Sequence, residues 1–191
     1  RTIEDLEKMK TAATRGTVGV VVSGGLLGLE AAKALRDLGL ETHVVEFAPR
    51  LMAVQIDDGA GKILRNKIAA LGVGIHLGKN TTEIVDGETC RHRMNFADGS
   101  HLETDMILFS AGIRPRDELA RSSGLNVGAR GGIEIDNDCR TNDTDVYAIG
   151  ECALWGGRIY GLVAPGYQMA ETAAHAIIAS EKKKEFAGAD M

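Results

Sequence analysis

The chain has 191 residues, of which 44% are hydrophobic and 26% are charged, and its net charge at neutral pH is −5. This length and composition are typical of one large or two small globular domains. Neither nucleic acid nor an anionic membrane is indicated as a partner, and no apolar segment approaches the roughly 20 residues that cross a bilayer. Three distant cysteines, Cys90, Cys139 and Cys152, favour reduced thiols in the cytoplasm over a disulfide framework or a zinc site.

The first part of the chain predicts alternating helices and parallel strands. Thr2 is placed to cap a helix over Ile3–Ala13. A strand over 17–22, a helix over 26–38 that ends at Gly39, and a strand over 41–47 follow. A long amphipathic helix that covers the sheet is then predicted, ending at Gly72 before a strand over 73–77. Its apolar positions are Ile56, Ala60, Ile63, Leu64, Ile68 and Leu71.

The pattern changes near residue 80. Short strands are predicted over 81–85, 90–96 and 101–103, with turns at Asp86-Gly87 and Asp98-Gly99. A three-stranded antiparallel meander thus replaces the crossover helix of a doubly wound domain. A strand over 105–110 then returns to the parallel sheet, and the loop over 111–115 follows at its carboxyl end, where α/β sheets bind ligands.

A domain boundary is predicted at 115–120. The remaining segment predicts strands over 132–136, 146–149 and 158–162 and a helix over 166–180, after which the basic run 182–184 complements the helix dipole. This segment is too short and too broken to form a complete nucleotide-binding fold.

A glycine-rich turn joins the first strand to its helix. Ser23, Gly25 and Gly28 occupy the three positions of G-x-G-x-x-G, and Glu46 follows at the end of the second strand. Gly25 lets the backbone approach a pyrophosphate, Gly28 lets the helix approach the strand, and Glu46 is placed to accept ribose hydroxyls. The amides at the start of the helix, near Leu26 and Leu27, face the phosphates.

Ser23 departs from this pattern. A serine makes the tight turn only at negative φ or with a strain of about 1–2 kcal/mol, and the neighbouring Gly24 is expected to absorb part of the bend. The competing interpretation is an ordinary strand–turn–helix in which the glycines serve packing alone.

Four local signatures together resemble the pyridine nucleotide–disulfide oxidoreductase superfamily, which uses flavin and nicotinamide cofactors. They are the glycine-rich turn with Glu30 and Glu46, the antiparallel meander, segment 110–115 and segment 141–151. Segments 25–35, 44–52, 147–153 and 161–170 are most similar to the branch formed by the large subunits of NAD(P)H-dependent assimilatory nitrite reductases. The resemblance implies an α/β fold with a Rossmann-like NAD domain and part of a split FAD domain. Residues 1–14 would be a helix that connects from the FAD domain, 15–115 the NAD(P)H-binding domain, 116–181 the second half of the FAD domain, and 182–191 a tail. The first FAD half and the portions with an iron–sulfur cluster and sirohaem would lie in a longer protein.

The resemblance also assigns roles to single residues. It places Glu30 near the nicotinamide, Glu46 on the adenosine ribose and Gly112 against the nicotinamide nucleotide. Gly150 and Glu151 would lie at the flavin, where Glu151 stands in place of an aspartate that holds the ribityl chain. The last helix would direct its N-terminus, near Tyr167 and Gln168, toward the flavin ring. No catalytic acid or base and no metal ligand is assigned.

Each role has an alternative. Glu30 could be a solvated helix acid, Glu151 an acid at a helix N-terminus, and Gly112 a turn residue. Arg50 could pair with Glu46 or accept the 2′-phosphate of NADPH, but a carboxylate at position 46 repels that phosphate, which favours NADH.

The leading hypothesis is an electron-input module that passes a hydride from NADH to FAD in a multi-centre nitrite reductase. As an isolated piece it is expected to bind FAD poorly, to be inactive alone and to self-associate through exposed apolar surface. The alternatives are an NADH-dependent rubredoxin or ferredoxin reductase and a non-catalytic dinucleotide-binding module.

Overall fold

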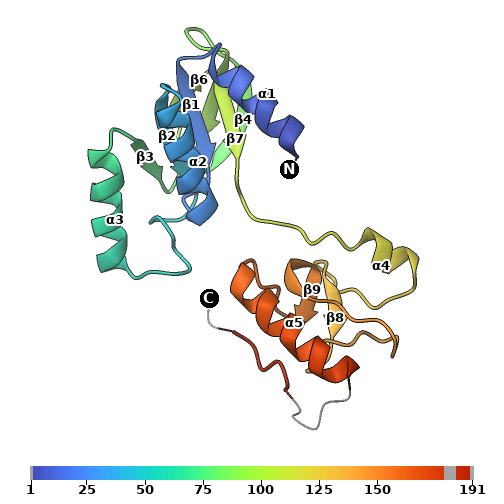
Figure 1. Cartoon of the computed structure of the whole chain (residues 1–191). Coiled ribbons are helices and arrows are strands. Elements are labelled where there is room, and N and C mark those ends of the chain that lie inside the picture. Colours follow the sequence, from blue (N-terminus) through green and yellow to red (C-terminus); the bar gives the residue numbers. More distant parts are fainter. Residues whose placement is uncertain (1, 179–183, 190–191) are drawn as a thin grey trace. The chain divides into compact units, whose positions relative to one another are not determined.

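The computed structural model describes residues 2–178 and 184–189. The chain forms two compact units, Arg1–Ala111 and Gly112–Met191, which are described separately (Figure 1).

A four-stranded parallel sheet is the centre of unit 1. Its strands are β1 (Val18–Val22), β2 (Glu41–Glu46), β3 (Gly74–Leu77) and β7 (Met106–Phe109), in the order β3-β2-β1-β7. The valines of β1 and β2 are β-branched and largely buried, as expected for strands covered on both faces. All four carboxyl ends therefore meet at one edge of the sheet.

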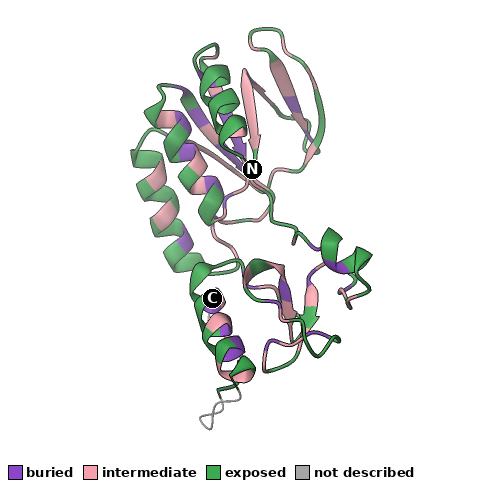
Figure 2. Cartoon of the chain, turned by 45° about the vertical axis from the view of Figure 1, so that its right-hand side comes forward, coloured by how far each residue is buried: buried purple, intermediate pink, exposed green. Residues whose placement is uncertain are grey.

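Two helices cover one face of this sheet. They are α2 (Leu26–Asp37) and α3 (Asp58–Ala70), and their residues join Val21 and Val44 in one apolar cluster. Their outer surfaces are exposed (Figure 2). The predicted apolar face of α3 is too wide, because only Leu64 and Ile68 pack against the cluster whereas Ile63 is exposed.

The predicted meander covers the other face. It consists of β4 (Thr81–Asp86), β5 (His92–Phe96) and β6 (His101–Thr104), paired antiparallel in that order. Met94 and Phe96 are buried against Val20 and Val45. Successive residues of a strand point to opposite faces of the sheet, so Val20 and Val45 face the meander whereas Val21 and Val44 face the helices.

Helix α1 (Ile3–Ala13) begins at Thr2 as predicted. The Thr2 side chain accepts from the Asp5 amide and the Asp5 carboxylate accepts from the Thr2 amide, which forms a capping box. The apolar side chains Ile3 and Leu6 of this helix are exposed.

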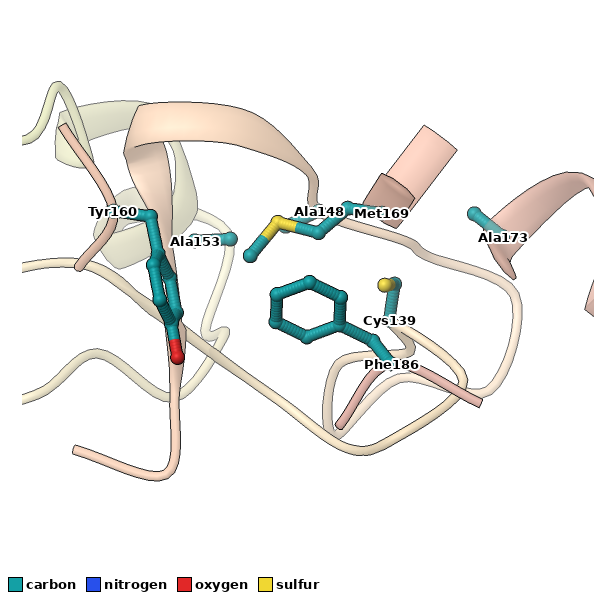
Figure 3. Packing of buried hydrophobic residues seen from close by; sticks show 7 residues of the cluster. All are labelled: Cys139, Ala148, Ala153, Tyr160, Met169, Ala173 and Phe186. Carbon is teal, nitrogen blue, oxygen red and sulfur yellow. The ribbon is translucent and has the colours of Figure 1, made fainter. Parts of the chain in front are cut away.

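Unit 2 is built around one small core. It contains α4 (Glu118–Ser122), β8 (Ile133–Ile135), the 3₁₀ turn η1 (Gly150–Cys152), β9 (Ala153–Trp155) and α5 (Val163–Ile177). The ring of Phe186 lies among Met169, Cys139 and Tyr160 (Figure 3), and it meets the Trp155 and Tyr160 rings edge to face. Residues 184–189, which lie in the range assigned above to a tail, therefore contribute to this core.

Two strands predicted for unit 2 are wrong. Residues 146–149 form a single bridge, Arg140 to Tyr147, and residues 158–162 form a single bridge, Trp155 to Arg158. The first segment is ended by Gly150 at φ 77°, and the second follows a turn with positive φ at Gly156 and Gly157. The strand that does form is β9, which pairs parallel with β8.

The last helix begins at Val163 rather than at residue 166, and the end predicted for it at Ser180 lies outside the described residues. Of the basic run, only Lys184 is described, and it pairs with Glu171. Among residues 2–178 and 184–189, no helix combines the length and apolar composition that crossing a membrane requires.

Phe186→Ala should destabilise unit 2. The side chain is 2% exposed, and removing a buried phenyl ring typically costs about 3–5 kcal/mol. Urea denaturation should show this loss, whereas Leu119→Ala, at a side chain that is 80% exposed, should change the free energy of unfolding by less than about 0.5 kcal/mol. Equal effects of the two substitutions would show that residues 184–189 do not pack in solution.

Asp105 should make stability depend on pH. Its carboxylate accepts from the amides of Thr17, Val18 and Arg91, and the first two of these bonds are the main cause that lowers its pKa from 3.8 to about 2. Because the folded pKa lies below the ordinary value, the stabilisation is complete above about pH 4 and is lost as pH falls toward 2. Asp105→Asn should therefore be less stable than the wild type at pH 7. The difference in their free energies of unfolding, measured with urea, should shrink as pH falls from about 4 to 2. A deficit that stays constant with pH would contradict this role.

Candidate functional site

The turn after β1 is held in an uncommon backbone conformation. Ser23 has φ 140°, a region that side chains disfavour by about 1–2 kcal/mol. Its amide donates to Val45 O at 3.0 Å, and its hydroxyl accepts from the Gly25 amide at 3.2 Å. The expectation that Gly24 absorbs the bend is wrong, since Gly24 does not take a positive φ and Ser23 carries the strain.

The Glu46 carboxylate lies at the carboxyl end of β2 and is bonded to both neighbouring segments. Oε2 accepts from the Gly24 amide at 2.5 Å, and Oε1 accepts from the Ala48 amide at 2.7 Å. A carboxylate has about four lone-pair positions, so each oxygen can accept one more hydrogen bond. Sequence reasoning missed this role of Glu46 in joining the two segments.

The two glycines at the start of α2 differ in their surroundings. A Cβ on Gly28 would lie 2.2 Å from the carbonyl oxygen of Ser23, so only glycine permits this close packing of helix and turn. A Cβ on Gly25 would meet only Ser23 Oγ, at 3.5 Å, and Gly25 has φ −80°. Gly25 therefore leaves open space that the fold itself does not require.

The N-terminus of α2 has no side-chain cap. Its N-cap is Gly25, no acid lies in its first turn, and the side chains of Leu26 and Leu27 are about half exposed. Uncapped amides at the positive end of a helix dipole favour an anionic group.

Two further predicted residues lie near this turn. Glu30 is exposed on α2. Arg50 does not pair with Glu46, because its guanidinium donates to Asp58 Oδ1 at 2.9 Å and to the carbonyls of Ala53 and Ile56. Arg50 is thereby held by the segment that leads into α3.

Phe47 is a residue of the site that sequence reasoning did not single out. It follows Glu46 directly, and its side chain is 74% exposed. The backbone on either side is fixed, since Lys79 N donates to Glu46 O and Gly78 N donates to Ala48 O. The sequence did contain a signal for Phe47, because it is a large aromatic residue that directly follows the acid at the end of a strand.

Unit 2 contains a second candidate region. A shallow groove of about 460 Å³ lies where α5 begins, and Gly150, Glu151, Val163 and Tyr167 are among the residues that line it. The N-terminus of α5 has no side-chain cap, and a Cβ on Gly166 would lie 3.5 Å from Gly150 Cα. The helix start is Val163, so Tyr167 lies one turn further into α5 than the sequence suggested.

Gly112 opens unit 2 with φ 83°, a conformation suited to glycine, and open space surrounds its Cβ position. The structure thus brings the predicted residues 23–28 and 46 together in unit 1 and places 150 and 151 at the groove of unit 2, whereas Arg50 is bonded to the segment before α3. Among the described residues, no group of three or more acidic, histidine or cysteine side chains is arranged to hold a metal ion.

The sheet, glycine turn and terminal acid of unit 1 are those of a Rossmann-like α/β protein. The family model described as pyridine nucleotide-disulphide oxidoreductase matches residues 1–177. The chain belongs to this family.

Individual relatives agree with this assignment. The chain is 63% identical over 191 residues to the NAD(P)H nitrite reductase large subunit of Klebsiella oxytoca, covering 100% of this chain and 20% of that protein. It is 58% identical over 192 residues to the NADH nitrite reductase large subunit of Escherichia coli (strain K12), covering 100% and 22%. The chain therefore spans about a fifth of the length of these curated relatives. The solved structure of a ferredoxin reductase for the CYP199A2 system from Rhodopseudomonas palustris superimposes with a TM-score of 0.86 at 28% identity, covering 100% of this chain and 48% of that one.

Substitution of Ser23 should reverse the usual order of alanine and glycine. Both substitutions lose the bond to the Gly25 amide, but at φ 140° glycine is unstrained whereas alanine keeps the strain. Ser23→Gly should therefore be more stable than Ser23→Ala by about 1 kcal/mol in urea denaturation. If alanine is the more stable substitution, position 23 has a negative φ in solution.

Proposed function

We propose that unit 1 binds NADH at the turn between β1 and α2. The observation that carries this proposal is the combination of an open Gly25, an uncapped helix N-terminus and the Glu46 carboxylate at one edge of the sheet. The amides of the first turn of α2 would hold the pyrophosphate, and the remaining lone pairs of Glu46 would accept the ribose hydroxyls.

Glu46 and Arg50 together favour NADH over NADPH. A 2′-phosphate would meet the negative charge of Glu46, and Arg50 is already bonded to Asp58. Glu30 and Gly112 are proposed to lie toward the nicotinamide end, as the family resemblance implies.

We propose that the groove at the start of α5 forms part of an FAD site. Its apolar residues suit a flat aromatic ring, the uncapped helix N-terminus favours negative charge, and Glu151 is exposed beside it to accept a hydroxyl. When bound, FAD supplies the redox chemistry that accepts two electrons from NADH. This chain's residues bind and orient, and none of them is required to move a proton.

On this basis the chain is the electron-input part of a longer nitrite reductase. The chain is 63% identical to a nitrite reductase large subunit but 28% identical to the solved ferredoxin reductase from Rhodopseudomonas palustris. This difference supports the nitrite reductase function over a stand-alone ferredoxin reductase. Residues 1–14 would connect from the FAD domain, 15–115 would be the NAD domain, and 116–181 would be the second FAD half. The partners would be the remainder of that enzyme, and exposed apolar residues such as Ile3 and Leu6 suit contact with it or self-association. The three free cysteines fit a reducing compartment such as the cytoplasm.

Gly25→Val tests the nucleotide site separately from the fold. Valine fits the open space at φ −80°, so urea stability should change little, but its side chain would keep the pyrophosphate from the backbone. Calorimetric titration should show NADH binding to the wild-type chain and at least a tenfold weaker affinity in the variant. Gly59→Ala, at a glycine of α3 outside the site, is the matched control. A wild-type chain that binds neither NADH nor NADPH while folded would overturn the proposal.

Phe47→Ala tests the proposal that the adenine of NADH stacks on the exposed Phe47 ring. Stacking of a base on an aromatic ring is worth about 1–3 kcal/mol, so the affinity for NADH should fall about 5- to 100-fold. Affinity for reduced nicotinamide mononucleotide, which has no adenine, should not change, and Leu71→Ala serves as an exposed apolar control in the same unit. Equal losses for both nucleotides would place the adenine elsewhere.

A further inference from the structure

Two histidines on neighbouring strands of unit 1 lie in direct contact. His43 on β2 and His76 on β3 point to the same face of the sheet, with His76 Nε2 3.2 Å from His43 Nδ1 and ring centroids 5.2 Å apart. In the register of the two strands, His43 is opposite Gly74 and His76 is opposite Val45. Neither histidine belongs to the proposed nucleotide or flavin site.

Glu41 lies beside this pair of rings, with its carboxylate 3.3 Å from His43 Nε2. A carboxylate in this position favours the tautomer with the proton on Nε2. In that tautomer His43 Nδ1 has a lone pair on the side of His76, and His76 Nε2 supplies the proton of the contact. A carboxylate beside the outer nitrogen is the usual partner of a metal-bound imidazole.

Gly74 makes room for this arrangement. A Cβ at position 74 would lie 2.1 Å from His43 Nδ1, so any other residue would displace the His43 ring from its present position. The contact is thus specified by the backbone of the facing strand as well as by the two histidines.

The distance between the two nitrogens suits a shared metal ion. Two imidazoles bound to one tetrahedral ion at about 2.0–2.1 Å have nitrogens about 3.3 Å apart. Burial, followed by the proximity of His43 and Lys79, lowers the pKa of His76, and a metal ion binds the neutral form of an imidazole. His43 is mostly buried, with 16% of its side chain exposed.

We propose that His43 and His76 form a two-ligand chelate for a divalent transition-metal ion such as Zn²⁺ or Ni²⁺. The ion replaces the proton between the rings, and that proton moves to His76 Nδ1. Since the described residues contain no group of three such ligands, water fills the other coordination positions. The bound ion would link the edge strand β3 to β2.

Calorimetric titration of the 191-residue chain with Zn²⁺ and with Ni²⁺ at pH 7.5 tests the site. Both measurements use Cys90→Ser/Cys152→Ser as the background, because these two thiols are partly exposed. One ion should bind per chain. His43→Asn and His76→Asn should each weaken binding at least tenfold, whereas His101→Asn, at an exposed histidine of β6, should have no effect.

Two further variants distinguish binding by both rings in this geometry from weak metal binding by single histidines. Gly74→Ala keeps both histidines but displaces one ring, and it should lose binding. Glu41→Gln removes the carboxylate charge beside His43 Nε2, and it should reduce affinity about tenfold. Thermal melts of all variants without metal establish that they fold.

The affinity should also fall with decreasing pH, because protonated imidazole does not bind metal. The absence of binding to the background chain, or binding that survives His43→Asn or Gly74→Ala in a folded protein, would overturn the proposal. NADH affinity is measured separately on the same samples, so failure of the metal site is distinguishable from failure of the nucleotide site.

Discussion

The carboxylate of Glu46 joins the two backbone segments from which the candidate nucleotide site is made. One oxygen accepts from the Gly24 amide in the turn after β1, and the other accepts from the Ala48 amide after β2. The second segment is tied in turn to the end of β3 through Lys79 N and Gly78 N. The strained turn at Ser23 and the backbone on either side of Phe47 are therefore held in fixed positions, which would reduce the entropy lost if a nucleotide binds there.

The glycine-rich turn combines one glycine that the fold requires with one that the fold leaves unexplained. Gly28 is needed for packing, because any side chain would overlap the carbonyl of Ser23, whereas Gly25 faces open space and has an ordinary φ. Folding alone explains why position 28 is glycine, but it does not explain why position 25 is glycine. Ser23 shows that the turn tolerates a side chain at a positive φ, where its hydroxyl accepts from the Gly25 amide and offsets part of the strain.

Sequence reasoning was most successful where local signals agreed with one another. Thr2 marked the start of α1, Gly39 and Gly72 marked helix ends, and turn residues separated the strands of the meander. It failed in unit 2, where Gly150 ended a predicted strand and β9 formed in a segment with no strand signal. Short elements in a small core depend on partners distant in sequence, such as Phe186 against Trp155, and local patterns do not report them.

The sequence by itself determined the order of elements in unit 1, the glycine turn and the acid that ends β2, because periodicity and turn chemistry are local properties of a chain. Only the tertiary structure decided that Glu46 bonds to both adjoining segments, that Arg50 pairs with Asp58, and that His43 meets His76 beside a glycine. These contacts join residues from different strands and loops. Their geometry follows from strand register and backbone position, which no single segment specifies.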